Sequence, residues 1–218
     1  MTPVTADPDH FTSQLLAWYA DNGREFPWRQ TDDPYRILIC EVLLRRSRST
    51  TVAKVAGPFF ERWPSAAALA DADAGEVVDV IRPLGLTSRA SQLVALGQGL
   101  RDRADFPSSV AELVSLPGVG RYAATATLGE PSVDGTSARV YRRYFGQFDA
   151  AHHKTVDDTL WELAAAVLSV QREVTRRLNW AVLDLAAGPC SPTRPKCAVC
   201  PLQQGCRWTT KDGAWEKP

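Results

Sequence analysis

Apolar residues recur at helical spacing along most of the 218-residue chain. The clearest amphipathic face has apolar side chains at i, i+3, i+4, i+7, i+8 and i+11, namely Val52, Val55, Ala56, Phe59, Phe60 and Trp63. Pro58 lies within this stretch and is expected to kink the helix. Similar spacing predicts further helices over residues 11–19, 76–81, 89–101, 110–115, 121–128, 136–144, 155–168 and 174–187. Ser109 and Glu112 fit a capping box at the start of one of them.

Residues 36–44 are the best candidate for a strand, because they are rich in Ile, Leu and Val. However, polar and apolar positions do not alternate there, and no hairpin partner lies nearby. We therefore expect a fully buried helix, in which Cys40 is a small buried hydrophobe. The chain is then predicted to be all-α, and the polar stretch 145–155 is the expected loop between two halves.

The composition is that of an ordinary globular protein, with 44% hydrophobic and 23% charged residues. The length suits one large domain or two small ones that share a core. No apolar run approaches the roughly 18 residues of a membrane span, and the polar, acidic N-terminus is not typical of a signal or transit peptide. We therefore expect a soluble intracellular protein with no membrane partner.

The net charge is zero for the whole chain but differs between its two parts. Residues 1–138 hold 13 basic and 17 acidic residues, a net charge of −4, whereas residues 139–218 hold 12 and 8, a net charge of +4. A neutral chain is not typical of a nonspecific polyanion binder. Basic residues still gather at four places, within 45–48, 139–143, 172–177 and 194–196. Each group is either part of a local basic face or a solvated helix surface.

Residues 116–121, with the sequence LPGVGR, join two predicted helices. Glycine allows a tight turn and leaves backbone N–H groups uncovered, and the N-terminal end of a helix favours an anion. Such a turn can bind a DNA phosphate without any side chain, although an ordinary helix connector could have the same glycines. We favour phosphate binding, with Leu116, Gly118, Val119, Gly120 and Arg121 as the DNA-binding residues.

Two carboxylates are candidates for catalysis. Glu41 is the only charged residue within 37–44, and burial would raise its pKa, as a general acid requires. It could instead lie on a solvent-facing stripe or pair with Arg45. Asp134 precedes a predicted helix and could be a catalytic carboxylate or a plain N-cap. The residues alone leave these alternatives open.

Four of the five cysteines lie within 17 residues, with the spacing C-x6-C-x2-C-x5-C, and are Cys190, Cys197, Cys200 and Cys206. In an intracellular protein such a group indicates a metal or iron–sulfur site rather than disulfides. Four thiolates could hold a cubane cluster or zinc. Only one short C-x2-C knuckle is present, and this spacing favours iron–sulfur over a zinc ribbon. Arg194 and Lys196 lie in the loop between Cys190 and Cys197. A bound cluster could brace this loop as a basic, DNA-binding loop.

These features, in this order, resemble the helix–hairpin–helix DNA glycosylases of the endonuclease III class, over about residues 11–208. In that family the four cysteines hold a [4Fe–4S] cluster. The segment FPWRQTDDPYRILICEVLLRRS is most similar to the thymine–guanine mismatch glycosylases. The adenine glycosylases typically have two glutamines where Arg45 and Arg46 stand, and an extra C-terminal domain that is not expected here. Endonuclease III proper has a catalytic lysine where Tyr122 stands, so no lyase activity is expected.

The resemblance implies a role for each candidate residue in the removal of a base. The target base leaves the stack, Leu86 fills the gap, and Arg45 or Arg46 contacts the orphaned guanine. Asp134 stabilises the positive charge that develops on the sugar and orients water, while Glu41 protonates the leaving base.

One segment departs from the family's pattern. Thirteen positions separate Arg121 from Asp134, several fewer than the family usually has, so the helix after the hairpin or its loop must be shorter. This shortening affects how deep Asp134 lies in the pocket that receives the base, and it makes Glu130 a second candidate for the catalytic carboxylate. Tyr122, in the same segment, either contacts the flipped base or packs within its helix.

The family also implies the architecture and the partners. Two helical lobes would hold DNA between them, a helical barrel over residues 31–140 and a cluster-bearing lobe of residues 1–30 and 141–218. The implied function is a monofunctional, monomeric glycosylase that removes thymine or uracil opposite guanine from double-stranded DNA. The alternatives are an adenine or modified-base glycosylase, or a catalytically silent DNA-binding protein. Twenty Arg against five Lys suggest a GC-rich bacterial source, and hence a cytoplasmic, nucleoid-associated protein.

Overall fold

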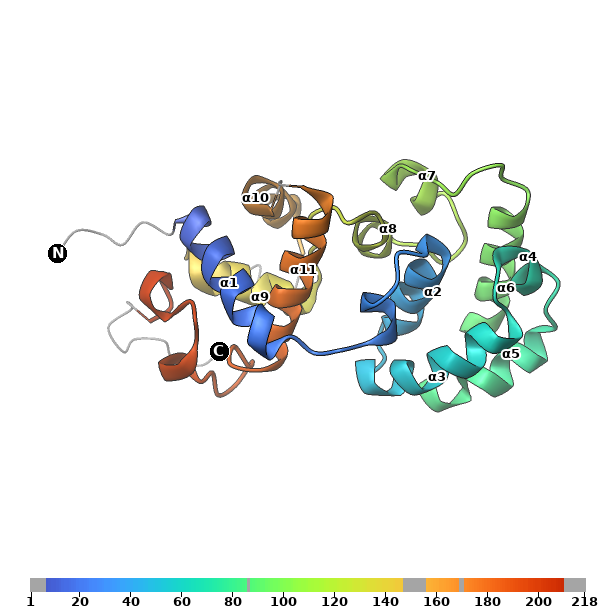
Figure 1. The fold of residues 1–218 in the computed structure, drawn as a ribbon, viewed down its shortest axis with the longest axis horizontal. Coiled ribbons are helices and arrows are strands. Elements are labelled where there is room, and N and C mark those ends of the chain that lie inside the picture. Colours follow the sequence, from blue (N-terminus) through green and yellow to red (C-terminus); the bar gives the residue numbers. More distant parts are fainter. Residues whose placement is uncertain (1–6, 86, 147–155, 169–170, 210–218) are drawn as a thin grey trace. The chain divides into compact units, whose positions relative to one another are not determined.

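The computed structural model describes residues 7–85, 87–146, 156–168 and 171–209. Every regular element in these ranges is helical and none is a strand, which confirms the all-α prediction. The chain divides into two compact units. We call Glu25–Leu128 the hairpin unit, and Met1–Arg24 together with Gly129–Pro218 the cysteine unit (Figure 1). No helix in the described ranges is long and apolar enough to cross a membrane.

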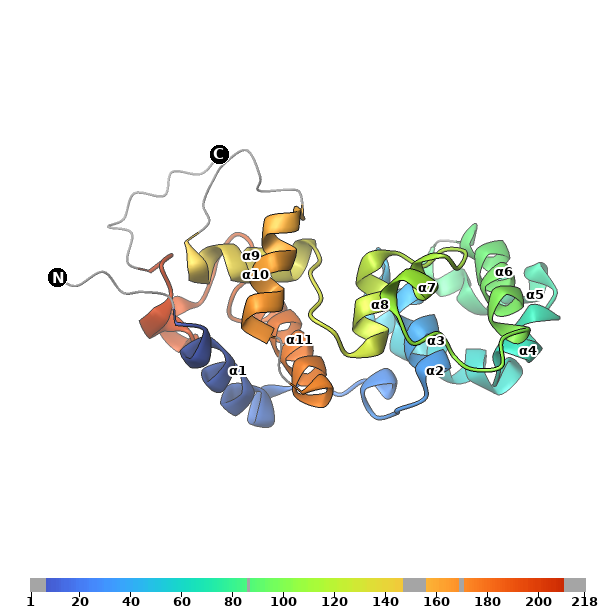
Figure 2. The same ribbon diagram turned by 90° about the horizontal axis from the view of Figure 1, so that it is seen from above.

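The hairpin unit is built around helix α2, which packs against α3, α8 and the short helix η1 (Figure 2). Its helices, in chain order, are η1 (Pro27–Arg29), α2 (Pro34–Leu44), α3 (Ser49–Arg62), α4 (Ala66–Ala70), α5 (Ala74–Ile81), η2 (Arg82–Leu84), α6 (Arg89–Arg101), α7 (Val110–Val114) and α8 (Arg121–Leu128). Helix α3 contains Pro58 and does not end there.

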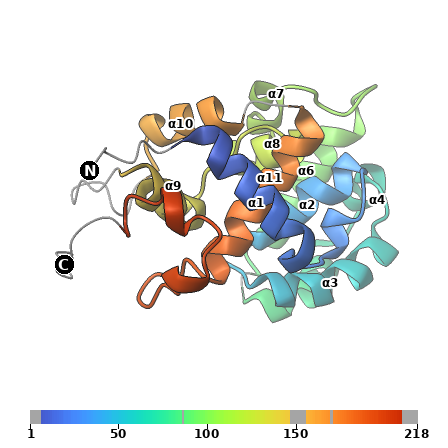
Figure 3. The same cartoon turned by 60° about the vertical axis from the view of Figure 1, so that its left-hand side comes forward.

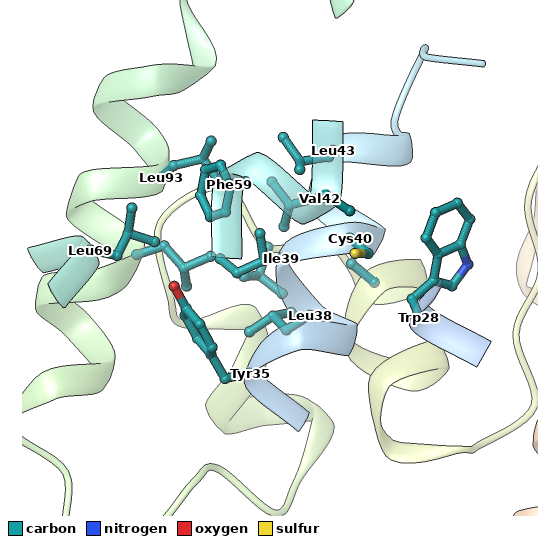
Figure 4. Packing of buried hydrophobic residues seen from close by; sticks show 14 of the residues in the cluster. Trp28, Tyr35, Leu38, Ile39, Cys40, Val42, Leu43, Phe59, Leu69 and Leu93 are labelled. Carbon is teal, nitrogen blue, oxygen red and sulfur yellow. The ribbon is translucent and has the colours of Figure 1, made fainter. Parts of the chain in front are cut away.

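The ambiguous apolar segment forms α2, a buried helix, as expected. Asp33 caps it by accepting hydrogen bonds from the N–H groups of Tyr35 and Arg36, and Pro34 occupies the first turn. Eight of its eleven residues are buried, so the helix has no wide polar face that would produce an amphipathic pattern. Figure 4 shows the side chains of α2 packed in the core beside those of α3, α4 and α6, namely Leu38, Ile39, Cys40, Val42, Leu43, Phe59, Leu69 and Leu93.

Helix α4 was not predicted from the sequence, because its five residues are too few for a periodic pattern. Ser65 caps it by accepting a hydrogen bond from the N–H of Ala68. The helix lies on α6 at Gly97, where an added Cβ would stand 2.7 Å from the backbone nitrogen of Ala70. The close approach of α4 therefore depends on a glycine far away in the sequence.

The cysteine unit places α1 and α9 on α11, and α10 packs against α1 and α9 (Figure 3). Its helices are α1 (Pro8–Asn22), α9 (Gly135–Phe145), α10 (Asp158–Leu168), α11 (Arg172–Ala187), η4 (Cys197–Val199) and η5 (Gln203–Gly205). The ring of Phe11 lies 4.9 Å from that of Tyr144 in the core. The buried Asp184 accepts hydrogen bonds from the backbone N–H of Arg24, at 2.7 Å, and from its Nε, at 2.8 Å.

The boundaries of the units lie at 24/25 and 128/129, not at the expected 30/31 and 140/141. Phe26 and Trp28 stack with ring centroids 4.7 Å apart and belong to the core of the hairpin unit. Val133 and Val140 belong to the core of the cysteine unit. A boundary at 140 would also cut α9, so the contacts of this helix place the second boundary before Asp134.

Candidate functional site

The predicted hairpin is present and its turn is fixed by buried side chains. Ser109 and Glu112 form the expected capping box on α7. In the turn, Gly118 has φ +77°, a conformation that favours glycine. The N–H of Val119 donates to the carbonyl of Leu116 at 3.2 Å, and both side chains are buried. The predicted geometry of two helices joined by a glycine turn is thus confirmed, while the role of this hairpin in DNA binding remains a prediction.

The surface of this turn is formed by backbone. A Cβ added at Gly120 would have no heavy atom within 4 Å, so a ligand can approach the main chain there. Within the described part of the chain, no acceptor takes the N–H of Gly118 or of Gly120. The side chain of Arg121, at the start of α8, is exposed. These groups can receive an anion at the N-terminal end of a helix.

Glu41 is buried on α2, with only 7% of its surface exposed. The alternative of a solvent-facing stripe is therefore wrong. Helix α8 packs directly against α2, so the buried carboxylate and the hairpin belong to two neighbouring helices of one unit. Tyr122, in the first turn of α8, is half-buried.

The end of α2 presents two arginines. The helix ends at Leu44, and the side chains of Arg45 and Arg46 are exposed. Arg46 has φ +60°, a left-handed conformation that is uncommon for a residue with a side chain. The N–H of Ser47 donates to the carbonyl of Leu44 at 3.0 Å and closes the turn. Leu86, the expected gap-filling residue, lies outside the described residues.

Asp134 is the N-cap of α9. Its Oδ1 accepts hydrogen bonds from the N–H groups of Thr136, at 2.9 Å, and Ser137, at 2.7 Å. The N–H of Asp134 in turn donates to the hydroxyl of Ser137 at 2.9 Å. The structural role suggested by the sequence is therefore confirmed. Both cap bonds use Oδ1 and leave the other oxygen of the carboxylate for a second task, so the cap and a catalytic role are compatible.

The shortened segment before Asp134 is held by α11. The side-chain amide of Asn179, 6% exposed, donates from Nδ2 to the carbonyl of Glu130 at 2.8 Å. Its Oδ1 accepts from the N–H of Ser132 at 3.1 Å. One buried amide thus satisfies both a donor and an acceptor of the loop. The role of Asn179 was not predicted, because its only signal in the sequence is a polar residue among the apolar positions of 174–187.

The four clustered cysteines line one pocket that is partly open to solvent, together with Arg143, Pro189, Pro195, Gln203, Trp208 and Thr209. Burial raises the pKa of Cys200 to about 11, and nearby Cys190 and Cys206 act in the same direction. A metal group that binds here must therefore displace protons. Within the described ranges, no group of three or more Cys, His, Asp or Glu side chains could hold a single metal ion.

Two arginines of α9 hold the loop that carries these cysteines. Arg143 donates to the carbonyls of Ser191 and Pro192, both at 2.8 Å, and to Sγ of Cys190 at 3.4 Å. Arg139 donates to the carbonyl of Cys190 at 3.0 Å. The basic group within 139–143 is therefore not a solvated helix surface. Its side chains join the cysteine loop to the helix that begins at Asp134.

Arg194 and Lys196 have exposed side chains on the same loop. The backbone around them is fixed, because the N–H of Lys196 donates to the carbonyl of Pro189 at 2.8 Å and the hydroxyl of Ser191 donates to the carbonyl of Arg194 at 2.6 Å. The two cations are thus held on an ordered turn. Of the two candidate catalytic carboxylates, Glu41 lies in the hairpin unit and Asp134 in the cysteine unit.

Comparison with known proteins identifies the protein family to which the chain belongs. The sequence profile of the HhH-GPD superfamily, described as base excision DNA repair proteins, matches residues 39–166. The chain therefore belongs to the HhH-GPD superfamily. The expected helix–hairpin–helix class is confirmed.

Within this superfamily, the chain is similar over nearly its whole length to proteins named thymine or thymine/uracil-DNA glycosylase. The chain is 34% identical over 212 residues to a thymine/uracil-DNA glycosylase of Pyrobaculum aerophilum, covering 93% of this chain and 92% of that protein. It is 34% identical over 209 residues to a thymine-DNA glycosylase of Aeropyrum pernix, covering 91% and 94%. The solved structure of a thermostable thymine-DNA glycosylase matches with a TM-score of 0.84 at 31% identity, covering 94% of this chain and 97% of that one.

Proposed function

We propose that this protein is a monofunctional DNA glycosylase of base excision repair that removes thymine or uracil opposite guanine from double-stranded DNA. The observation that carries the proposal is its similarity, over more than nine-tenths of the chain, to proteins named thymine/uracil-DNA and thymine-DNA glycosylase. The buried Glu41 beside the hairpin and the N-cap Asp134 supply the two carboxylates that the reaction needs. The enzyme acts as a monomer in the cytoplasm, on nucleoid DNA.

The backbone of the hairpin binds the DNA. The N–H groups around Gly118 and Gly120 contact a phosphate next to the flipped nucleotide, and Arg121 adds a positive charge. Leu116 and Val119 are buried and hold the turn in shape. Because backbone groups carry no sequence information, this contact positions the duplex without selecting a base. Arg194 and Lys196 contact the phosphate backbone from the cysteine unit.

Selection comes from the flipped base and from the base left behind. Extrusion costs a few kcal/mol of stacking and pairing, and the cost is least for a mispaired base. Leu86 fills the gap, while Arg45 and Arg46 contact the orphaned guanine. Arginine is suited to the O6 and N7 acceptors of guanine.

The chemistry is hydrolysis of the bond between the base and C1′ of the sugar. As that bond breaks, the electron pair leaves with the base and positive charge develops on the sugar. The carboxylate of Asp134 stabilises this charge and orients the water that adds to C1′. Glu41 supplies a proton or hydrogen bond to the leaving base. Tyr122 bounds the pocket that receives the base.

No lyase step is expected. A Schiff base needs a lysine amine, and α8, with the sequence RYAATATL, has none. Tyr122 stands at the position where the resemblance to endonuclease III implies one. A Tyr122→Lys variant that gains strand cleavage, trapped with borohydride, would support this explanation of the missing step.

The cysteine cavity fits a [4Fe–4S] cluster held by Cys190, Cys197, Cys200 and Cys206. Four thiolates could also hold zinc, but the single short C-x2-C knuckle in this spacing favours iron–sulfur over a zinc ribbon. Four thiolates that line one pocket can hold a cubane cluster. When bound, the cluster supplies a rigid brace for the loop that carries Arg194 and Lys196. Iron and sulfide analysis of the purified protein distinguishes the two metals.

A base-release assay on a panel of duplexes tests the proposal. We expect release from duplexes with T:G and U:G mispairs, and none from A opposite 8-oxoguanine. Release of adenine instead would favour an adenine glycosylase, and release of a damaged base alone would favour a modified-base enzyme. Binding without release on every duplex would indicate a catalytically silent DNA-binding protein.

A further inference from the structure

We propose that Arg89 is a positioning residue for recognition of the base opposite the flipped nucleotide. Its buried guanidinium holds the turn after α2 so that Arg45 and Arg46 face the DNA. The inference rests on the proposed function, because it assumes that these two arginines contact the orphaned guanine. All of the residues concerned belong to the hairpin unit.

Arg89 completes the C-terminal end of α2. Only 5% of its surface is exposed, although it is the first residue of α6. Its Nη1 donates to the carbonyl of Leu43 at 3.0 Å and approaches that of Val42 at 3.4 Å, and its Nη2 donates to the carbonyl of Arg45. The last carbonyls of a helix have no partner within the helix. A planar group with five donors can satisfy several of them at once.

The contact with the carbonyl of Arg45 determines where the following residue goes. That carbonyl belongs to the peptide bond that joins Arg45 to Arg46. Arg46 then takes φ +60°, which is unfavourable for a residue with a side chain unless the surroundings impose it. The backbone is thus held from inside the unit while both side chains remain exposed. Arg89 thus fixes the backbone of Arg45 and Arg46, and the side chains of these two residues stay exposed and available for a ligand.

The electrostatics of the turn fit a ligand that accepts hydrogen bonds. Burial lowers the pKa of Arg89, and the nearby charges of Arg45 and Arg46 lower it further. The negative end of the α2 dipole offsets part of this repulsion for the buried group. The two exposed guanidiniums gain most from an external acceptor, and guanine presents two such atoms on one edge.

Arg89 also follows directly on the segment expected to enter the gap in the duplex. Gly85 has φ +71°, and the N–H of Ala90 donates to the carbonyl of Thr87 at 3.0 Å. The same side chain therefore links the start of α6, just after residues 85–88, to the end of α2.

The test compares the affinity for an uncleavable abasic-site analogue opposite guanine and opposite adenine, so that no chemical step enters. Arg46→Ala should reduce the preference for guanine about tenfold, the range of one good arginine–guanine contact. Arg89→Gln should reduce it by a similar factor, because Gln cannot reach all three carbonyls. Arg89→Lys, a smaller change that keeps the charge, should give an intermediate loss.

A double-mutant cycle distinguishes positioning from general weakening of the fold. In a background that carries both Arg45→Ala and Arg46→Ala, Arg89→Gln should have almost no further effect on the preference. Arg101→Gln is the matched control, because Arg101 ends the same helix with an exposed ion pair to Asp71, and it should leave the preference unchanged. Melting temperatures and circular dichroism show that each variant is folded at the assay temperature, and Arg89→Lys carries the test if Arg89→Gln does not fold.

The outcomes separate this inference from the function on which it rests. If Arg46→Ala reduces the preference and neither Arg89 variant does, or if the two effects simply add, Arg89 has only a structural role and the inference is wrong. If neither Arg46→Ala nor Arg89→Gln changes the preference, the assignment of the α2 turn to the orphaned guanine is itself wrong, and the inference falls with it.

Discussion

The two units are stabilised in different ways. The described residues of the hairpin unit include four buried polar or charged side chains, and those of the cysteine unit include seven, of which Asn179 and Asp184 connect distant segments. The hairpin unit relies mainly on a continuous apolar core around α2. The cysteine unit has an apolar core of its own, and in addition buried side-chain hydrogen bonds and a pocket lined by four cysteines. Its structure therefore depends more on individual side chains and, if the proposed cluster is present, on that cluster as well.

This difference bears on how each unit holds the groups proposed to contact DNA or to act on it. In the hairpin unit, the groups proposed to contact DNA are backbone N–H groups and exposed arginines around a continuous apolar core. In the cysteine unit, Asp134 begins the helix whose arginines hold the cysteine loop. Loss of the cluster should therefore affect the placement of Asp134 more than the shape of the hairpin.

The largest expected effect is on catalysis without a change in structure. Asp134→Asn should slow base release about 10³-fold, while the affinity for mismatched DNA and the melting temperature stay close to those of the wild type. Asparagine is as good an N-cap as aspartate, so α9 keeps its start. Single-turnover release at saturating enzyme measures the effect.

Asp73→Asn is the control for this substitution, since Asp73 also caps a helix, by accepting from the N–H groups of Gly75 and Glu76. It should leave base release unchanged. An Asp134→Asn enzyme with full activity would limit Asp134 to its cap.

The next effect concerns the stability of the cysteine unit and its dependence on the four clustered cysteines. Cys200→Ala should remove the bound iron and cost about 3 kcal/mol or more of the stability of the cysteine unit, because a structural metal group contributes directly to folding. Hydrogen exchange should lose protection in α9 and α11 and keep it in α2 and α8. Cys40→Ala, in the core of the hairpin unit, should leave the iron content unchanged. Equal loss of protection in both units would contradict the comparison.

A third effect concerns the buried carboxylate of the hairpin unit. Glu41→Gln should slow base release about 100-fold by removing the proton donor, with little change in DNA affinity. Single-turnover base release, with DNA affinity measured alongside, separates the loss of the proton donor from weaker binding. An unchanged rate would assign Glu41 a structural role only.

The smallest of these effects concerns the loop before Asp134. Asn179→Ala should cost about 2 kcal/mol, because it leaves the buried N–H of Ser132 without its acceptor and the carbonyl of Glu130 with only the hydroxyl of Ser132 as donor. Denaturant unfolding measures the loss. Asn179→Asp keeps the acceptor for Ser132 and places a negative charge beside the carbonyl of Glu130, so it should also destabilise. If both variants are as stable as the wild type, the loop does not depend on α11.

Periodicity and local chemistry were enough to predict most of the helices, the buried α2 and the capping box at Ser109. They failed where stability comes from contacts distant in sequence. Helix α4 depends on Gly97, the end of α2 on Arg89, and the loop before Asp134 on Asn179. No local pattern records such contacts, because each joins residues about 30 to 50 positions apart.

The candidate site was predicted in parts. The hairpin, the grouping of the cysteines and the cap at Asp134 followed from motifs with a local mechanism. The burial of Glu41 was one of several alternatives that only packing could decide. The role of the arginines on α9 was not predicted, because helical spacing cannot distinguish a solvated cation from one that holds a distant loop.

The central claim is that the hairpin backbone and two carboxylates from separate units act on one nucleotide. The most direct measurement is a crystal structure with a duplex that carries a 2′-fluoro thymidine, which resists cleavage, opposite guanine. We expect the thymine flipped out of the duplex, with its base against Glu41, C1′ of its sugar beside Asp134 and an adjacent phosphate on the N–H groups of Gly118 and Gly120. A thymine still stacked in the duplex, or carboxylates that line different surfaces of the complex, would contradict the claim.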